Sequence, residues 1–233
     1  MQICGLNKTT LLDYPEHVAA TVFTGGCNFR CPFCHNSSLV IQSPENVTLT
    51  TGQVLTFLEK RKGILEGVCI TGGEPTLQPD LESFLIDVKA LGYLVKLDSN
   101  GYRPDVLKEL VEKKLVDYIA MDVKASRENY ARVAGCSRES FETDRIDESI
   151  RFLKSCGVAY EFRTTAVKGL HKIEEFESIG RWLKGAGQYF LQGYQESEGV
   201  LQPGYKAFTM EEMKALQELA GKYIDKVYIR GVE

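Results

Sequence analysis

Residues 25–36, which read GGCNFRCPFCHN, place three cysteines in one short loop with the spacing C-x3-C-x2-C. Four thiolates complete the coordination of a [4Fe–4S] cluster, so three thiolates leave one iron without a protein ligand. An open coordination position lets a metal bind and activate a second molecule. The loop of Cys27, Cys31 and Cys34 therefore indicates a reactive cluster more than a structural metal site.

Two other interpretations of these cysteines are a zinc site and a disulfide. Zinc sites usually bring their ligands as two separated pairs, and His35 directly follows Cys34, so the two side chains would rarely reach one metal. Seven cysteines, an odd number, and the lack of an apolar leader segment disfavour a disulfide framework. The spacing favours the cluster and leaves both alternatives open. The remaining cysteines are scattered: Cys4, Cys69, Cys136 and Cys156.

Composition narrows the kind of protein. The chain has 233 residues, of which 43% are hydrophobic and 26% charged, as in ordinary globular proteins. Its net charge of −4 argues against a nucleic-acid partner, and no apolar run reaches the length of a membrane span. The cysteines favour a reducing compartment. We therefore expect a single domain over residues 1–233, located in the cytoplasm, with no membrane or nucleic-acid partner.

Short apolar runs alternate with helical patterns along the chain. Most runs lack strict alternation, as expected of strands buried on both faces. The expected strands cover residues 18–24, 68–71, 93–97, 116–121, 160–167, 189–192 and 226–230. This order predicts parallel strands with right-handed crossovers. About six such units would build an incomplete barrel or an open sheet, and we expect an α/β fold, a partial (β/α)6 TIM-like barrel with outer helices.

The helices between the strands are marked by apolar spacing and by their ends. Asp80 is placed to cap one helix, and Pro104 is placed to begin the next. Thr209 with Glu212 predicts a capping box at the start of a later helix. The apolar stripes of these helices are expected to pack into the core.

Polar motifs follow four of the expected strands, where ligands bind in parallel α/β folds. The cysteine loop follows the first, residues 72–75 (GGEP) the second, 98–101 (DSNG) the third and 122–124 (DVK) the fourth. Paired glycines let a ligand approach the backbone closely, and the carboxylate of Glu74 suits an ammonium group. The four motifs are therefore expected to converge on one site.

Each motif also has an ordinary structural interpretation. Gly-Gly and Asn-Gly pairs are common turn sequences. Asp122 and Lys124 point to the same face of a strand, where they need a partner or a ligand, or they form a surface ion pair beyond the strand end. Arg163, inside the fifth strand, pairs with Glu161 or clamps a carboxylate or ribose.

The motifs GGCNFRCPFCHN, ITGGEPTL, LDSNG and MDVK, in this order, resemble those of the radical S-adenosylmethionine (SAM) superfamily. The resemblance covers most of the chain, and the cysteine spacing is highly specific. Within the superfamily, the chain is similar to the activating enzymes of glycyl radical enzymes. Its opening, GLNKTTLLDYPEHVAATVFTGGCNFRCPFCHN, and its ending, VYIRGVE, look most like the larger variant of the anaerobic ribonucleoside-triphosphate reductase activating protein.

The resemblance implies a single [4Fe–4S] cluster on Cys27, Cys31 and Cys34, with SAM chelating the open iron, because the chain lacks the eight-cysteine insert of some activating enzymes. It implies SAM contacts from Phe33, Cys34, His35, Gly72, Gly73, Glu74, Asp98, Ser99, Asp122, Val123, Lys124, Arg163 and Gln195. Asp98, Ser99 and Asp122 also resemble a monovalent-cation site. Gln195 departs from the family pattern, which has histidine there; glutamine still hydrogen-bonds but does not titrate near neutral pH.

The implied activity is the activation of a glycyl radical enzyme. One electron reaches the cluster, SAM is cleaved to methionine and a 5′-deoxyadenosyl radical, and the radical removes a hydrogen from a glycine Cα of the partner. The expected partner is the anaerobic ribonucleotide reductase, and the electron donor is a protein such as flavodoxin or ferredoxin. No side chain is assigned as acid or base, because the cofactors carry the chemistry.

Three alternatives stay open. A pyruvate formate-lyase-type activating enzyme shares all the motifs, and a small-molecule enzyme such as 7-carboxy-7-deazaguanine synthase shares the cysteine loop and GGEP. A non-enzymatic electron carrier or zinc module would not bind SAM, and an electron-carrying cluster needs a fourth cysteine. The short chain favours a barrel open at one side, which suits a protein substrate.

Overall fold

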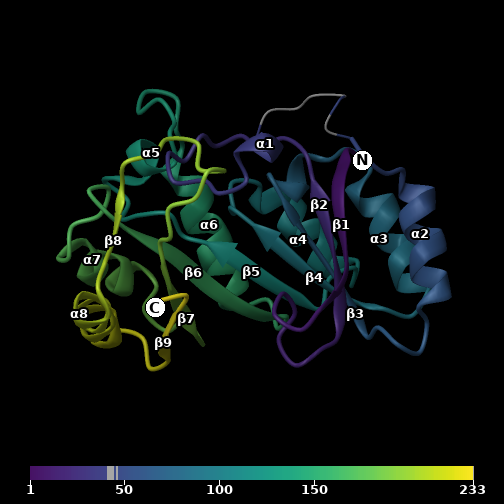
Figure 1. Ribbon diagram of the computed structural model, residues 1–233. Helices are drawn as coiled ribbons and strands as arrows, with labels where there is room; N and C mark the ends of the chain where they lie inside the picture. Colours follow the sequence, from purple (N-terminus) through teal and green to yellow (C-terminus); the bar gives the residue numbers. More distant parts are fainter. Residues whose placement is uncertain (41–44, 46, 233) are drawn as a thin grey trace. The chain divides into compact units, whose positions relative to one another are not determined.

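The computed structural model describes residues 1–40, 45 and 47–232, and the chain divides into two compact units. Figure 1 shows the elements of both units along the chain. The single domain expected over residues 1–233 stays a prediction. Unit 1 comprises Met1–Asn28, Ser38–Ser99 and Arg103–Ala120, and unit 2 comprises Phe29–Ser37, Asn100–Tyr102 and Met121–Glu233.

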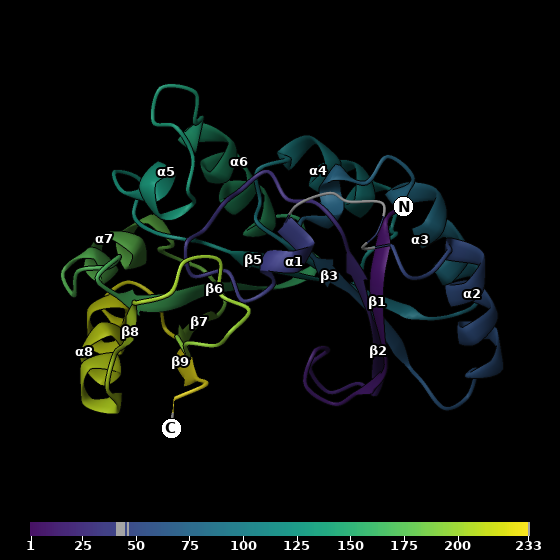
Figure 2. The same cartoon turned by 45° about the horizontal axis from the view of Figure 1, so that its top comes forward.

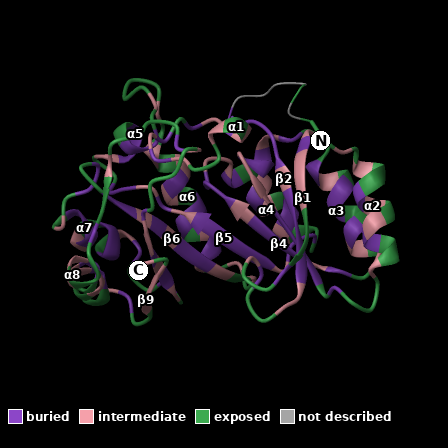
Figure 3. Ribbon diagram, viewed as in Figure 1, coloured by how far each residue is buried: buried purple, intermediate pink, exposed green. Residues whose placement is uncertain are grey.

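The strands of unit 1 lie in the order β1-β2-β3-β4-β5. β1 (Ile3–Thr10) is antiparallel to β2 (Ala19–Thr24), whereas β2, β3 (Gly67–Gly72) and β4 (Leu94–Ser99) are parallel. β5 (Tyr118–Asp122) begins in unit 1 and ends in unit 2. Most residues of β2 and β3 are buried, as predicted for strands covered on both faces (Figure 3).

Helices connect the parallel strands of unit 1. Their buried residues lie on one side of each helix, for example Val54 and Leu58 in α2 and Phe84 and Leu85 in α3. α2 and α3 lie side by side (Figures 1 and 2). The elements are α1 (Ser37–Val40), which starts in unit 2, α2 (Thr51–Lys60), η2 (Pro75–Leu77), α3 (Leu81–Ala90) and α4 (Pro104–Glu112).

Unit 2 continues the order with β5-β6-β7-β9, of which β6, β7 and β9 are parallel. The short β8 pairs antiparallel with β6. α7 packs closely on α8 because Gly180 has no side chain; a Cβ there would lie 2.8 Å from Ala220 Cα. The elements are β6 (Ala159–Lys168), β7 (Tyr189–Gly193), β8 (Lys206–Ala207), β9 (Val227–Arg230), α5 (Tyr130–Val133), α6 (Thr143–Leu153), α7 (Glu175–Trp182) and α8 (Met210–Gly221).

The predicted fold class is confirmed. All seven expected strands are present as β2 to β7 and β9, most of the sheet is parallel, and helices alternate with the strands. The sequence analysis misses β1, an antiparallel strand at the edge of the sheet. Its exposed half carries polar residues such as Asn7 and Lys8, so it lacks the apolar run of a buried strand.

The helix ends agree with the predictions in part. α4 begins at Pro104 as predicted, and Thr209 with Glu212 forms the capping box of α8. Asp80 occupies the N-cap position of α3 as predicted, but its carboxylate makes no capping bond and instead contacts the N-terminal ammonium group of Met1. Within the part of the chain that the structure describes, no helix is long and apolar enough to cross a membrane.

Candidate functional site

The first part of the cysteine loop belongs to unit 1 and leaves the end of β2. The Gly26 N–H donates to Leu39 O at 2.6 Å, and the Cys27 N–H donates to Val40 O at 3.2 Å. These bonds hold the loop against α1. Cys27 is half-buried, so its thiol lies at the boundary between core and solvent.

The second part of the loop belongs to unit 2 and is braced by two other segments. The Arg30 N–H donates to Ala134 O at 2.8 Å, and the N–H groups of Leu201 and Gln202 donate to Cys34 O at 3.0 Å and Pro32 O at 2.8 Å. A turn within the loop brings the Cys34 N–H to Cys31 O at 3.0 Å. Backbone hydrogen bonds thus fix the second part of the loop.

An aromatic cluster anchors Phe29, which lies between the first two cysteines. Its ring is 5.6 Å from that of Tyr102 and 5.7 Å from that of Phe141. Phe141 in turn stacks on Tyr130 at 5.4 Å. Such contacts stabilise beyond the area that they bury. The sequence analysis missed this cluster because its rings come from segments far apart in the chain.

The donor set of the loop fits an iron–sulfur cluster. Among residues 1–40, 45 and 47–232, no three His, Cys, Asp or Glu side chains are arranged around a single metal ion. That observation concerns one bound ion, whereas each cysteine of a [4Fe–4S] cluster binds a different iron, so the thiolates do not converge on one point. Cys27, Cys31 and Cys34 supply three thiols from one backbone-braced loop.

The glycines of GGEP meet the end of β2 in unit 1. The Gly73 N–H donates to Thr24 O at 2.9 Å, and the Glu74 N–H donates to Gly26 O at 2.7 Å. Gly72 has a φ of +123°, and a Cβ on Gly72 or Gly73 would overlap backbone atoms of Thr24 or Gly26. Paired glycines are therefore required here for strand packing, and they join this motif directly to the cysteine loop.

Glu74 is buried, and its carboxylate accepts several hydrogen bonds. Its Oε1 accepts hydrogen bonds from the Thr76 N–H at 3.1 Å, the Thr76 hydroxyl at 2.6 Å and the Ser99 hydroxyl at 2.9 Å. The structure thus brings Glu74 and Ser99 together, as the convergence of strand ends predicts. It adds Thr76, which the sequence analysis missed although the residue follows GGEP directly.

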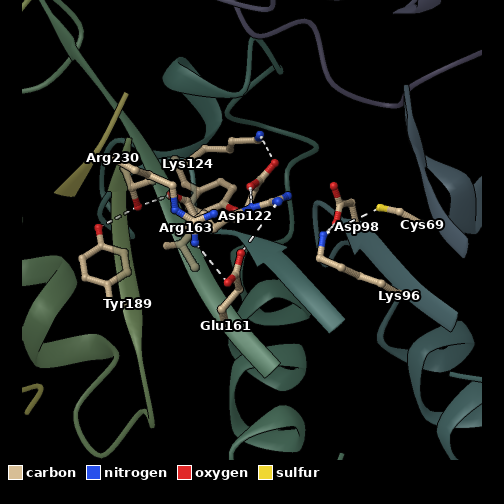
Figure 4. A network of polar contacts seen from close by, with 12 residues as sticks. Cys69, Lys96, Asp98, Asp122, Lys124, Glu161, Arg163, Tyr189 and Arg230 are labelled. Atoms are coloured by element: carbon tan, nitrogen blue, oxygen red, sulfur yellow. Dashed lines mark hydrogen bonds and ion pairs between the residues drawn. The ribbon is translucent and has the colours of Figure 1, made fainter. Parts of the chain in front are cut away.

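Asp98 is paired with a lysine of its own strand. The ammonium group of Lys96 contacts the Asp98 carboxylate and lies 3.7 Å from Cys69 Sγ on β3 (Figure 4). Lys96 is buried, with 2% of its surface exposed, and such a charge needs a partner. Lys96 was not predicted as a site residue, although a lysine inside an apolar strand is an unusual feature that points to a buried charge.

Asp122 forms ion pairs with two positively charged side chains in unit 2. The Lys124 ammonium lies 2.9 Å from Asp122 Oδ2, and Arg163 Nε lies 2.8 Å from Oδ1 (Figure 4). Burial raises the pKa of Asp122, but the charges of Arg163 and Lys124 outweigh burial and hold it below its ordinary value. The three groups carry a net charge of +1. β5 ends at Asp122, so Lys124 lies beyond the strand and the predicted common strand face is not observed. The alternative, an ion pair beyond the strand end, is found, and its side chains are largely buried.

Glu161 is the second acidic partner of this region. Its side chain is 1% exposed; Arg230 Nη2 of β9 lies 3.0 Å from Oε2, whereas Arg163 Nη1 lies 3.9 Å from Oε1. Arg230 also lies over the Phe190 ring, 3.5 Å from its centroid. Arg163 therefore pairs with Asp122 and also with Glu161, as the sequence predicts for the latter, and Arg230 is a further partner of Glu161 that was not predicted.

The remaining predicted contacts lie on strand and loop backbones. Val123 is buried, and its N–H donates to Arg163 O at 2.8 Å. Phe33 is also buried. The His35 Nε2 contacts the backbone oxygen of Gln195, whose side chain is exposed. The structure thus brings His35 and Gln195 together through the main chain of the latter.

His171 orders the backbone next to Lys124. Its Nε2–H donates to Lys124 O at 2.8 Å, and its Nδ1 accepts the Val167 N–H at 3.0 Å. Both bonds require a neutral ring with the proton on Nε2. Burial lowers the pKa of His171, which keeps the ring neutral.

Residues 21–183 match the radical SAM superfamily. The chain belongs to this superfamily. Membership implies an enzyme that uses a [4Fe–4S] cluster and SAM. The α/β fold and the motifs at the strand ends are those expected of a member.

Sequence similarity to two proteins that are named as activating enzymes places this radical SAM enzyme in that group. It is 32% identical over 239 residues to a Methanocaldococcus jannaschii protein named "Putative glycyl-radical enzyme activating enzyme", covering 99% of this chain and 96% of that protein. It is 28% identical over 189 residues to the pyruvate formate-lyase-activating enzyme of Clostridium pasteurianum, covering 75% of this chain and 72% of that enzyme.

A solved structure shares the fold. Streptococcus suis SuiB, in its structure bound to S-adenosylmethionine, superposes with a TM-score of 0.68 at 17% identity. The match covers 89% of this chain and 49% of SuiB, so the chain spans about half the length of that protein. At 17% identity, the similarity supports the fold of this chain and carries no information about its substrate.

Proposed function

We propose that this radical SAM enzyme activates a glycyl radical enzyme, and that the partner is an anaerobic ribonucleoside-triphosphate reductase. The observation that carries the proposal is the match at 32% identity, over nearly the whole of both chains, to a protein named for this activity. The choice of the reductase is supported by the opening residues 5–36 and the ending VYIRGVE, which resemble its activating protein.

In this proposal, Cys27, Cys31 and Cys34 hold a [4Fe–4S] cluster that supplies the electron for reductive cleavage of SAM. Glu74, fixed through Oε1 by Thr76 and Ser99, orients the ammonium group of the methionine part. The protein's contribution is to bind and orient SAM and to exclude water from it.

The net positive charge of Asp122, Lys124 and Arg163 suits the carboxylate of SAM. The other proposed SAM contacts are Phe33, His35, Gly72, Gly73, Asp98, Ser99, Val123 and Gln195. A monovalent cation at Asp98, Ser99 and Asp122 stays a prediction, and it would share the Asp98 carboxylate with Lys96. We further propose a cytoplasmic location and a flavodoxin or ferredoxin as the electron donor.

The test is to reconstitute the cluster anaerobically, add SAM and a reductant, and present the reductase. We expect a glycyl radical signal in electron paramagnetic resonance that depends on all three cysteines. Cys31→Ser should abolish the signal, whereas the control Cys156→Ser, outside the loop, should retain it. A silent reductase with intact SAM cleavage contradicts the partner, and cleavage that survives Cys31→Ser contradicts the cluster assignment.

A pyruvate formate-lyase is the second candidate partner, because the Clostridium pasteurianum enzyme matches three quarters of this chain. The two candidates are separated by offering both partner proteins at equal concentration and by locating the glycyl radical. A small-molecule reaction, such as that of 7-carboxy-7-deazaguanine synthase, predicts instead that a pterin-like compound stimulates SAM cleavage with no protein partner present.

A further inference from the structure

Tyr194 follows β7 in unit 2 and carries an orphan hydroxyl group. The side chain is almost fully buried, with 1% of the residue's surface exposed. Its hydroxyl is buried too, and it has no hydrogen-bond partner among the described residues of the chain. Folded proteins contain few such groups, because an unpaired buried hydroxyl destabilises the folded state. The hydroxyl therefore indicates a partner from outside the polypeptide.

Tyr194 lies close to the segment that carries Cys34, the last cysteine of the loop. Its ring lies 5.6 Å from the ring of His35, the residue after Cys34, with an interplanar angle of 31°. His35 also contacts the backbone oxygen of Gln195, and residues 201 and 202 brace Cys34 and Pro32. Tyr194 is thus held at the beginning of the segment that shapes the second half of the cysteine loop.

We propose that the Tyr194 hydroxyl hydrogen-bonds the nucleoside part of SAM, at an adenine nitrogen or a ribose hydroxyl. This inference rests on the proposed function, because it takes SAM as the ligand. A neutral phenol beside the His35 ring suits the uncharged nucleoside. The charged methionine part is instead assigned to Glu74 and to the group of Asp122, Lys124 and Arg163.

The protonation state of Tyr194 agrees with this role. Burial raises the pKa of Tyr194, and the nearby Glu196 and Tyr205 raise it further. The phenol therefore keeps its proton at neutral pH and is able to donate. The family pattern has a histidine at position 195, whereas Gln195 of this chain is exposed. In this proposal, the Tyr194 hydroxyl takes over as the hydrogen-bonding group after β7.

The test uses Tyr194→Phe, which removes only the hydroxyl. Binding of SAM, S-adenosylhomocysteine and methionine is measured by anaerobic equilibrium dialysis on protein with a reconstituted cluster. We expect the two nucleoside ligands to bind about threefold to tenfold more weakly to the variant, with methionine unchanged. The matched control is Tyr228→Phe, which removes a hydroxyl from an exposed tyrosine and should change neither.

Thermal unfolding of the cluster-free protein gives the second readout. Removing an orphan hydroxyl should leave the melting temperature unchanged or raise it. Equal SAM affinity in Tyr194→Phe overturns the inference, and a lower melting temperature would then give the hydroxyl a structural role. Equal losses for methionine and SAM overturn the nucleoside assignment. Failure of the wild-type protein to bind SAM contradicts the proposed function instead.

Discussion

The Ser99 hydroxyl at the end of β4 donates a 2.9 Å hydrogen bond to Glu74 Oε1, just after the end of β3. Two motifs that look independent in the sequence are therefore parts of one arrangement, because Ser99 fixes the carboxylate that GGEP presents. The Thr76 hydroxyl, at 2.6 Å from the same oxygen, completes it. A carboxylate held in this way is oriented before any ligand arrives.

Ser99→Ala tests this orientation. The change removes a hydrogen-bond donor to Glu74 Oε1, so we expect the free energy of unfolding to fall by about 1 kcal/mol and the dissociation constant for SAM to rise about threefold. Urea unfolding measures the free energy of unfolding, and equilibrium dialysis measures the dissociation constant for SAM. Ser155→Ala, at an exposed serine, is the control. Unchanged SAM affinity in Ser99→Ala would mean that this bond does not position the ligand.

Gly73→Ala tests the close approach of GGEP to the cysteine loop. A Cβ at this position would overlap the carbonyl group of Gly26, which is backbone and moves only with the loop. We expect a loss of at least about 2 kcal/mol in unfolding free energy and a lower iron content after reconstitution. Gly221→Ala, in α8 with open space around it, should be neutral or slightly stabilising. Normal iron content in Gly73→Ala would contradict the coupling.

Asp122→Asn leaves Lys124 and Arg163 without their negative partner. Because these side chains are mostly buried, we expect the cluster-free protein to lose about 2–3 kcal/mol of unfolding free energy. The comparison is Asp105→Asn, whose partner Arg103 is exposed and whose loss should cost at most about 1 kcal/mol. Equal effects of the two substitutions in denaturant unfolding would show that the Asp122 trio is solvated.

His171 predicts a loss of stability in mild acid. The pKa of the folded protein's His171 lies below the ordinary 6.5, so on acidification the unfolded chain takes up the proton first. Stability therefore falls as the pH drops below about 6.5, by up to about 1.4 kcal/mol at pH 5.5. Urea unfolding at pH 7.5 and 5.5 measures this effect.

The controls for that prediction are two further histidine variants. His171→Asn should be less stable at pH 7.5 and should show a smaller difference between the two pH values. His17→Asn, at the partly exposed pair with Glu66, should keep the wild-type difference. A pH dependence that persists in full in His171→Asn would contradict its assignment to His171.

Much of the fold follows from the sequence for a simple reason. Parallel strands buried on both faces are continuous apolar runs, so their positions and the motifs at their ends are visible in the chain. The end of a strand is less visible: Asp122 and Lys124 do pair, but β5 ends at Asp122 and Lys124 lies beyond it. β1 escaped prediction because an edge strand needs apolar residues on only one side.

What escaped prediction at the site depends on contacts between distant segments. Arg230 pairs with Glu161, which lies 69 positions away in the chain, and the sequence around either residue does not indicate this pairing. The role of Thr76 depends on where the Glu74 side chain turns. Whether Tyr194 lacks a partner is a property of its whole surroundings, which no local pattern encodes.

The bonds from Leu201 and Gln202 to Cys34 and Pro32 have a consequence for the order of folding. The segment that braces the second half of the loop follows the cysteines at a great distance along the chain. This half of the loop therefore cannot take its braced form before the later segment has folded against it.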